Sequence, residues 1–316
     1  MEPAFILYKH KEREMSAKLL SGKEVSEAML AKVLQDAQML KAHNIVPTLA
    51  IFRVGEDPGS ISYEKSIITR MAKSEIEVKS VVFPMDVTQD EFVAKIKEAN
   101  DDKNVNGILI FKPLPEQINE DEIKYMLAPE KDPDAMNPTN LGKLMIMDNE
   151  GFFPCTAEGV MELLKYYEID VKGKDITIIN NSNVFGKPLA IILTNEFATI
   201  SVCHIFTKSV KKYTSQSDIV ITGCGVYGLL TPDMVREDAI VIDVAMAQKK
   251  DADKNFVLDE NGKKIRTGDC REDMVDACAM ITSATPGCGG GTGPITTALL
   301  AQHLIKGCKL QNGMKL

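Results

Sequence analysis

The chain has 316 residues, of which 44% are hydrophobic and 26% are charged, and its formal net charge is −8. This composition is ordinary for a soluble globular protein, and the length suits two domains of roughly 150 residues each. The negative charge argues against a nucleic-acid-binding surface. No apolar run approaches the ~18 residues that span a bilayer, and the run at residues 5–8 is too short for a signal-peptide core. We therefore expect a cytoplasmic protein that contacts no membrane.

Seven cysteines and four histidines are present, but no two cysteines form a C-x-x-C pair. Spacings typical of zinc sites are absent, so we expect no bound metal. Reduced and mostly buried thiols are the simplest interpretation of these cysteines.

The first half of the chain alternates between helical and strand patterns. Apolar residues recur at helical spacing over residues 24–43, and strands are predicted at 48–55, 78–84 and 105–111. Further helices are predicted around 61–74 and over 88–102, the latter capped by Thr88. Two prolines, at 113 and 115, end the third strand because proline cannot donate to a sheet.

The second half repeats this rhythm. Strands are predicted at 174–180, 199–206, 217–225 and 238–245, with helices from 159 and from 188, where Pro188 suits a first turn. A last helix is predicted at 294–305, after a glycine-rich turn. Alternating strands and helices predict an α/β fold with parallel sheets and right-handed crossovers, and a domain boundary is expected near 151–159.

Three stretches are candidates for ligand binding, because ligands of open α/β sheets lie beyond the carboxyl ends of the strands. In "IINNSNVFGKP", Asn180, Asn181 and Ser182 follow a strand, and Gly186 opens a helix. The N–H groups and the dipole of a helix start suit a pyrophosphate. The stretch does not read G-x-G-x-x-G, so an ordinary strand-to-helix turn is the alternative.

The other two stretches are richer in glycine and in carboxylates. "TSATPGCGGGTGPITTALL" carries a run of glycines that lets the backbone approach a ligand closely, with a flexible surface loop as the alternative. "PEKDPDAMNPTNLGKL" holds Asp132 and Asp134 between prolines. A carboxylate in such a loop can accept two hydrogen bonds from a guanidine-like heterocycle edge, and a solvated turn is the alternative.

Together these stretches resemble the methylenetetrahydrofolate dehydrogenase/cyclohydrolase family, in order, from about residue 19 to 305. "RVGEDPGSISY" resembles the family's first signature, which leads to an active-site tyrosine at Tyr63. "KDPDAMNPTNLGKL" resembles "KDVDGFHPxNxGxL", which places the substrate-binding aspartate at Asp134. "GILIFKPLP" resembles "GILVQLPLP", "FFPCTAEG" resembles "FxPCTPxG", and "GGTGPIT" resembles "GGVGPMT".

The resemblance implies two α/β domains around a cleft. The folate-binding domain would comprise residues 1–155 and 287–316, so that the C-terminal helix returns to it, and a Rossmann-like, doubly wound NAD(P)-binding domain would comprise residues 156–286. It further implies hydride transfer from 5,10-methylenetetrahydrofolate to NAD(P)⁺, giving 5,10-methenyltetrahydrofolate, in a homodimer. The implied substrate contacts are Tyr63, Asp134, Gly290, Gly291 and Pro294.

The residues that the family uses for its second reaction, hydrolysis of the methenyl product, are replaced in this chain. The hydride step needs alignment rather than a base, whereas hydrolysis needs proton transfer, which the family assigns to a lysine and a glutamine. Those positions hold Ile67 and Phe111, and isoleucine cannot donate, accept or titrate. General acid–base help is worth roughly 10²–10⁴-fold, so we expect a dehydrogenase with little cyclohydrolase activity. The alternative is a bifunctional enzyme in which Lys112 or Lys65 moves the proton.

The cofactor positions favour NAD over NADP. Many relatives read "GRS" where this chain has Asn180 to Ser182, and many carry Ser or Arg where it has Ile205. The 2′-phosphate of NADP usually needs an arginine or hydroxyl partner. Against this, Lys208 is nearby, and no acidic residue ends the preceding strand to bind a ribose diol. The positions matched to the cofactor are Asn180, Asn181, Ser182, Gly186, Ile205 and Met246.

Two other functions compete with this interpretation. A degenerate paralogue could bind folate without turnover, but it would not need Tyr63 and Asp134 in place for the hydride step. A different two-domain dehydrogenase, such as a shikimate-type enzyme, would not carry "KDPD" and "GGTGPIT". A small folate is therefore the expected partner.

Overall fold

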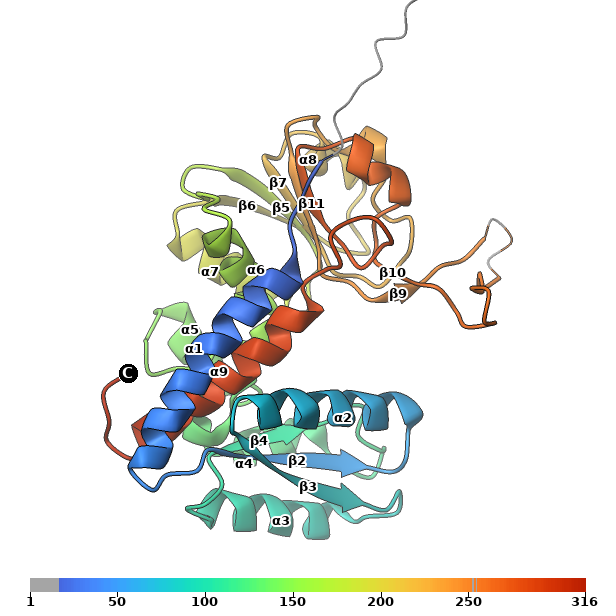
Figure 1. Ribbon diagram of the computed structural model, residues 1–316. Coiled ribbons are helices and arrows are strands. Elements are labelled where there is room, and N and C mark those ends of the chain that lie inside the picture. Colours follow the sequence, from blue (N-terminus) through green and yellow to red (C-terminus); the bar gives the residue numbers. More distant parts are fainter. Residues whose placement is uncertain (1–16, 252, 254) are drawn as a thin grey trace, which may run out of the picture.

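The computed structural model describes residues 17–251, 253 and 255–316. The apolar run at residues 5–8 lies outside these residues. Two α/β units lie at opposite ends of the molecule, and the long helices α1 (Gly22–Ala42) and α9 (Gly293–Gln311) run side by side between them (Figure 1). Both main sheets are parallel, which confirms the predicted fold class.

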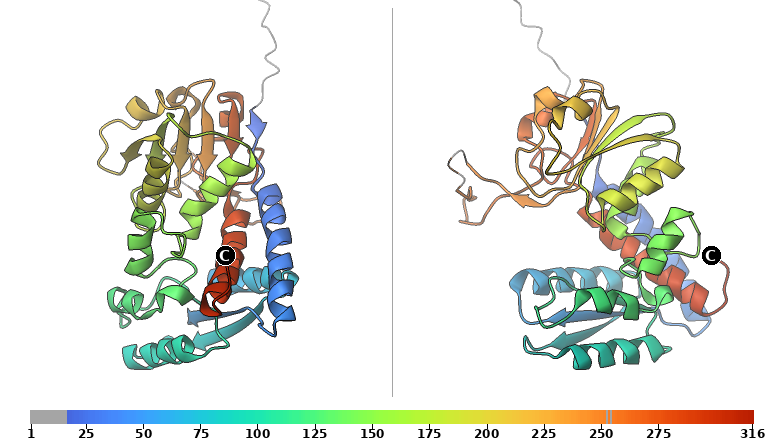
Figure 2. Two further views of the ribbon diagram at one scale, coloured as in Figure 1. Left: turned by 90° about the vertical axis from the view of Figure 1, so that its left-hand side faces the viewer. Right: turned by 180° about the vertical axis from the view of Figure 1, so that it is seen from behind.

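The first unit is a three-stranded sheet with helices on both faces. Its strand order is β3-β2-β4, from β2 (Thr48–Val54), β3 (Glu77–Phe83) and β4 (Gly107–Ile110). Helix α2 (Pro58–Lys73) covers one face, and α3 (Gln89–Asp101) and α4 (Glu120–Met126) cover the other (Figure 2). Thr88 caps α3 as predicted, because its side chain accepts from the Glu91 N–H while the Glu91 carboxylate accepts from the Thr88 N–H.

The second unit is a six-stranded parallel sheet in the order β1-β11-β8-β7-β5-β6. Its strands are β1 (Lys18–Leu19), β5 (Asp175–Ile179), β6 (Thr199–Cys203), β7 (Ile219–Thr222), β8 (Ile240–Asp243) and β11 (Met280–Thr282). The associated helices are α6 (Cys155–Tyr166), α7 (Gly186–Asn195) and α8 (Lys211–Thr214). Remaining elements are α5 (Pro138–Met145), an antiparallel pair β9 (Ala247–Gln248) and β10 (Arg266–Thr267), and 3₁₀ turns at Pro129–Lys131, Pro232–Met234 and Glu272–Asp276.

Some element boundaries differ from those predicted. The strands of the second sheet end before their predicted limits, since the apolar pattern continues into loops at the carboxyl edge. Helix α6 begins at Cys155 rather than at 159, and α9 continues to Gln311. Strand β1 was not predicted because two residues carry no period, and it adds residues 18–19 to the second sheet. The proposed domain limits, which gave those residues to the first domain, remain a prediction.

One apolar cluster joins the two units. It includes Leu40 of α1, Leu164 of α6 and Leu304 of α9, together with Ile51 of the first sheet and Ile178 of the second. Each of these side chains is almost completely buried. The central helices therefore share a core with both sheets, so that the relative placement of the units is fixed by packing.

A glycine-to-alanine pair tests this packing. A Cβ on Gly22, at the start of α1, would lie 2.1 Å from the carbonyl oxygen of Gly291. Because backbone would have to move, Gly22→Ala is expected to lower the free energy of unfolding by about 1–3 kcal/mol in urea titrations. The control is Gly142→Ala in α5, where no atom lies within 4 Å of the added carbon. Alanine should there stabilise the helix by about 0.5–1 kcal/mol, and equal effects of the two changes would contradict the packing argument.

Candidate active site

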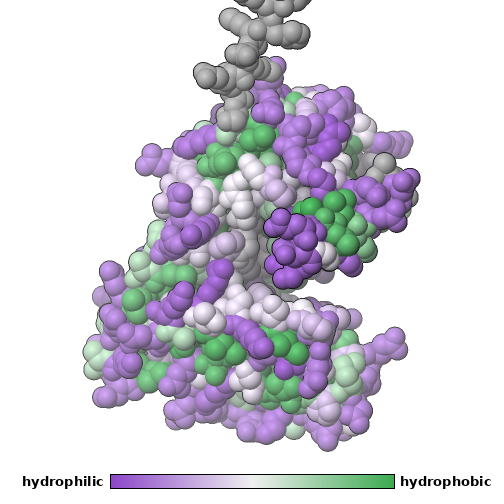
Figure 3. All heavy atoms as spheres, turned by 45° about the vertical axis from the view of Figure 1, so that its right-hand side comes forward, coloured by the Kyte–Doolittle hydropathy of each residue, from purple (hydrophilic) through white to green (hydrophobic). Residues whose placement is uncertain are grey.

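A cavity of about 700 Å³ lies at the carboxyl edge of the first sheet. Tyr63, Phe111, Lys112 and Asp134 line it together, so the structure gathers four residues that the sequence analysis placed in one site. Asn183 and neighbouring residues of the second unit also line it. Figure 3 shows the hollow between the two units in this region.

Helix α2 presents Tyr63 to the cavity. Asp57 starts the helix by accepting a 2.7 Å hydrogen bond from the Ser60 N–H, and bonds from Ser60 lower the pKa of the Asp57 carboxyl. Tyr63 is 45% exposed, yet the cavity walls remove it from bulk solvent and raise the pKa of its hydroxyl to about 12. Next to it in sequence, Glu64 is buried and accepts a 2.7 Å bond from the Arg53 guanidinium.

Ile67 and Phe111 stand at the positions of the family's lysine and glutamine, and both make apolar contacts in the structure. Ile67 is fully buried in the same cluster as Ile51 and does not line the cavity. The Phe111 ring packs on Tyr63 with a centroid separation of 5.2 Å and an interplanar angle of 31°. An aromatic contact therefore forms part of the cavity wall next to the tyrosine.

Lys112 lines the cavity although it follows Phe111 directly. Strand β4 ends at Ile110, so the alternation of faces that would have turned Lys112 away no longer applies. Its ammonium group forms an ion pair with Glu120, and its charge acts to lower the pKa of Asp134. Lys65, the other candidate for the proton carrier, is exposed on α2 and does not line the cavity.

The loop that carries Asp134 is built by its neighbour Asp132. The buried Asp132 carboxylate accepts bonds from the N–H groups of Met136 (3.0 Å) and Asn137 (2.7 Å). Burial raises the pKa of Asp132 to about 6, and these bonds act against that rise. Ala135 adopts a φ of 54°, which turns the chain sharply. Asp132 thus has a structural role, and Asp134 is left to face the cavity.

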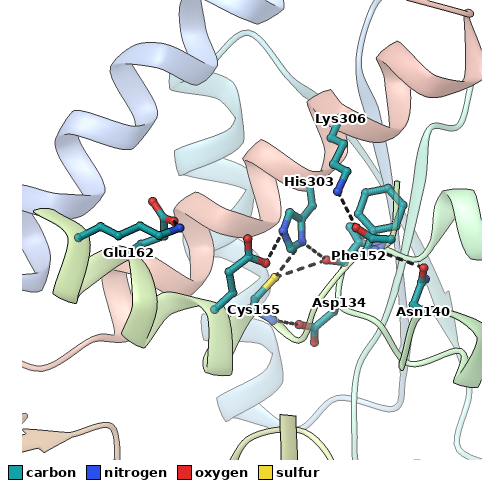
Figure 4. A network of polar contacts seen from close by, with 11 residues as sticks. Asp134, Asn140, Phe152, Cys155, Glu162, His303 and Lys306 are labelled. Carbon is teal, nitrogen blue, oxygen red and sulfur yellow. Dashed lines mark hydrogen bonds and ion pairs between the residues drawn. The ribbon is translucent and has the colours of Figure 1, made fainter. Parts of the chain in front are cut away.

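Asp134 is held from behind by a network that the sequence analysis missed. Its Oδ1 accepts a 3.2 Å bond from the Cys155 N–H, and His303 lies just beyond (Figure 4). The His303 ring is in turn 2.9 Å from the carboxylate of Glu158. Desolvation raises the pKa of Asp134 above its ordinary value, although the bonds from Cys155 and the charges of His303 and Lys112 act in the opposite direction. Cys155 and Glu158 lie in the stretch "FFPCTAEG", but no motif linked them to His303, because contacts between distant helices leave no periodic pattern.

The second candidate region lies at the carboxyl ends of β5 and β7. The Asn180 side chain joins them, donating to the Gly223 carbonyl at 2.7 Å and accepting from the N–H groups of Ser182 (2.8 Å) and Gly186 (3.1 Å). The Gly186 N–H is therefore already bonded to Asn180, and the pyrophosphate site expected at this helix start remains a prediction. Strand order reverses beside β5, which is where open α/β sheets bind dinucleotides.

The remaining cofactor candidates are spread around this edge. Met246, 64% exposed, lines a cavity of about 540 Å³ with residues 225–227. Asn181 is exposed, and Ile205 is 91% exposed beyond β6. Asp269, which the sequence analysis missed, shapes the loop after β7 by accepting from the N–H groups of Cys224 (2.7 Å) and Val226 (2.6 Å).

The glycine-rich turn lies at the start of α9 rather than on the wall of the 700 Å³ cavity that Tyr63 and Asp134 line. Gly290 and Gly291 have φ values of 85° and 75°, which side chains with a Cβ rarely adopt. The Pro294 carbonyl accepts a 3.2 Å bond from Arg70 of α2. Among the described residues, no group of His, Cys, Asp or Glu side chains could hold a metal ion, and no helix is long and apolar enough to span a membrane.

Two family models match most of the chain. The tetrahydrofolate dehydrogenase/cyclohydrolase catalytic domain matches residues 20–134, and the tetrahydrofolate dehydrogenase/cyclohydrolase NAD(P)-binding domain matches residues 154–312. The chain is 43% identical over 296 residues to the bifunctional protein FolD of Alkaliphilus metalliredigens, a match that covers 94% of this chain and 99% of the relative.

Solved structures agree with this match. The bifunctional FolD methylenetetrahydrofolate dehydrogenase/cyclohydrolase of Campylobacter jejuni has a TM-score of 0.84 and 38% identity, covering 93% of this chain and 99% of that one. The Trypanosoma brucei dehydrogenase–cyclohydrolase, complexed with NADP and an inhibitor, has a TM-score of 0.82 and 28% identity, covering 93% and 98%. The chain therefore belongs to the tetrahydrofolate dehydrogenase/cyclohydrolase family.

Proposed function

We propose that the protein oxidises 5,10-methylenetetrahydrofolate to 5,10-methenyltetrahydrofolate with NAD(P)⁺ and also hydrolyses the methenyl product. The observation that carries this proposal is the shared cavity of Tyr63, Asp134 and Lys112 in a chain of this family. The names of its relatives favour two activities over the loss of hydrolysis that Ile67 and Phe111 predicted. We therefore favour a bifunctional enzyme over a dehydrogenase that lacks hydrolysis.

For the oxidation, the residues need only to place the substrate. The lone pairs of N5 and N10 stabilise the cation that remains when the methylene carbon loses hydride, so no protein base is required. The Asp134 carboxylate would accept hydrogen bonds from the pterin edge, and the Tyr63 ring would pack on the folate. The nicotinamide cofactor supplies the hydride acceptor when bound. The open edge at β5, β7 and β8, with its cavity beside Met246, has room and position for a dinucleotide.

For the hydrolysis, a proton must move near the methenyl carbon. Water adds to that carbon, the C–N5 bond breaks, N5 gains a proton, and one proton is released overall as 10-formyltetrahydrofolate forms. Lys112 and Glu120 stand as a paired donor and acceptor on the cavity wall. Their position supports Lys112 as the proton carrier in place of the family lysine.

A pair of lysine variants tests this assignment. Lys112→Met should slow hydrolysis of methenyltetrahydrofolate by about 10²–10⁴-fold, because the proton carrier is gone, and should leave cofactor reduction within a few-fold of wild type. Both rates are followed spectrophotometrically on one preparation. The control is Lys124→Met, which removes another lysine of the same wall, paired with Asp121 at 2.5 Å, and should change neither rate.

The wild-type rates separate the competing functions. A hydrolysis rate no greater than the uncatalysed one would restore the interpretation of a monofunctional dehydrogenase. Neither reaction, combined with measurable tetrahydrofolate binding, would indicate a folate-binding protein without turnover.

We propose NAD as the preferred cofactor, on the neutral Asn181 and the apolar Ile205 at the expected 2′-phosphate positions. The Trypanosoma brucei relative binds NADP, so the choice needs measurement. Asn181→Arg should raise kcat/KM for NADP relative to NAD by about tenfold or more, since a hydrogen bond to a charged group contributes about 1.5–3 kcal/mol. Asn195→Arg, at the opposite end of α7, is the control. A wild-type preference for NADP above tenfold would reverse the assignment.

The pH dependence of folate binding follows from Asp134. Because desolvation raises its pKa, the carboxyl takes up a proton at a higher pH than an ordinary aspartate. Binding that needs the carboxylate is therefore complete above this raised pKa and is lost as the pH falls through it. Asp134→Asn should raise the dissociation constant for tetrahydrofolate by about tenfold at a pH above this raised pKa and should flatten the pH profile of binding, measured by calorimetry. The control Asp121→Asn, on the same cavity wall, should change neither the dissociation constant nor its pH profile. An unchanged pH profile in Asp134→Asn would contradict the assignment.

Homodimerisation and a cytoplasmic location remain predictions. Sedimentation of the purified protein would test the first, with a single species at twice the chain mass expected.

A further inference from the structure

His303 of α9 lies between two oxygen acceptors directly behind the Asp134 loop (Figure 4). Its Nδ1 is 2.7 Å from the Pro133 carbonyl oxygen, and its Nε2 is 2.9 Å from Oε2 of Glu158 on α6. The ring is almost fully buried, with 3% of the residue exposed, and it packs against the Phe152 ring at a centroid separation of 5.6 Å.

These contacts define the charge of the ring. A carbonyl oxygen and a carboxylate can only accept, so both ring nitrogens must donate, and the imidazole carries a proton on each. A neutral ring would set one unprotonated nitrogen against an oxygen acceptor at 2.7 or 2.9 Å, where two lone pairs repel each other. Burial acts against a charged ring, but the Glu158 carboxylate and the hydrogen bonds outweigh it and raise the pKa of His303. Burial likewise acts against the Glu158 charge, and His303 outweighs it and lowers the pKa of Glu158.

The same peptide unit connects this ion pair to Asp134. The Pro133 carbonyl, which accepts from His303, belongs to the peptide bond that leads into Asp134. Cys155 contacts both sides of that bond, because its thiol donates to the Pro133 carbonyl at 3.4 Å and its N–H donates to Asp134 Oδ1 at 3.2 Å. Helices α6 and α9 thus hold the aspartate backbone from one side, and the bonds made by Asp132 hold the loop from the other.

We propose that the His303–Glu158 ion pair fixes the position of the Asp134 carboxylate, so that His303 is a positioning residue for folate recognition. This inference rests on the proposed function, in which Asp134 binds the pterin edge. A charged donor held by a carboxylate fixes the Pro133 carbonyl more firmly than a neutral one would, since charge-assisted hydrogen bonds are shorter and stronger. Because α9 begins at the Gly290–Pro294 turn, the same helix links that turn to the substrate carboxylate.

An ion pair that merely ties α6 to α9 would behave differently. Its loss would lower stability and affect all substrates alike. A positioning role affects the folate selectively, because only the folate contacts Asp134. The ratio of the effects on the two substrates therefore separates the two roles.

The test uses His303→Gln in the full-length protein. Glutamine keeps a donor but not two opposed ones, so we expect KM for methylenetetrahydrofolate to rise about tenfold, with kcat at saturating folate and KM for the nicotinamide cofactor within about twofold of wild type. The control is Lys306→Met, one turn further along α9, whose ammonium donates to the Gly151 carbonyl. It should leave both KM values unchanged. Urea midpoints are measured for every variant, so that a loss of stability is not mistaken for a loss of positioning.

A double variant makes the test specific to Asp134. If His303 acts through that carboxylate, adding His303→Gln to Asp134→Asn should give no further rise in the dissociation constant for tetrahydrofolate, because coupled residues are not additive. Additive effects, or an unchanged KM in the single variant, would overturn the inference. An inactive wild-type protein that does not bind tetrahydrofolate would instead overturn the proposed function.

Discussion

Helix α9 is the constraint on which both halves of the molecule depend. It starts directly after the turn that follows β11 of the second sheet, and its apolar side chains, such as Leu299 and Leu304, belong to the core shared with the first. At its other end, the Gln311 amide donates to the carbonyls of Asn106 and Glu130 in the first unit. The packing of this one helix therefore sets the distance between the two sheets and the shape of the space between them.

The cavity combines two kinds of wall. The Tyr63 and Phe111 rings form an apolar side, and Lys112 and Asp134 bring opposite charges to another part of the same wall. A hydride step is helped by the apolar contact, which limits water, whereas addition of water needs the charged group. With Ile67 buried in the core, the lysines that line this cavity, Lys112 and Lys124, come from residues after β4 rather than from helix α2.

The sequence predicted those features that have a local cause. The capping box at Thr88 and the parallel α/β architecture are confirmed, and Tyr63, Phe111 and Asp134 lie at one cavity because strand ends gather at one edge. The position of Lys112 needed the structure, since it depends on where β4 stops. The His303 contacts could not be predicted, because Glu158 and Pro133 lie 145 and 170 residues away and are brought together only by the packing of α6, α9 and the Asp134 loop.

Strand β1 has a consequence for how the chain can be divided. Only Lys18 and Leu19 form it, yet they pair with β11 at the end of the six-stranded sheet, before the chain turns into α1. A fragment made of residues 156–286 alone would lack this cover, and β11 would present unpaired backbone groups to any passing strand. Such a fragment would also lose α9, so we do not expect it to fold as an independent unit. The two units are expected to unfold as a single cooperative body.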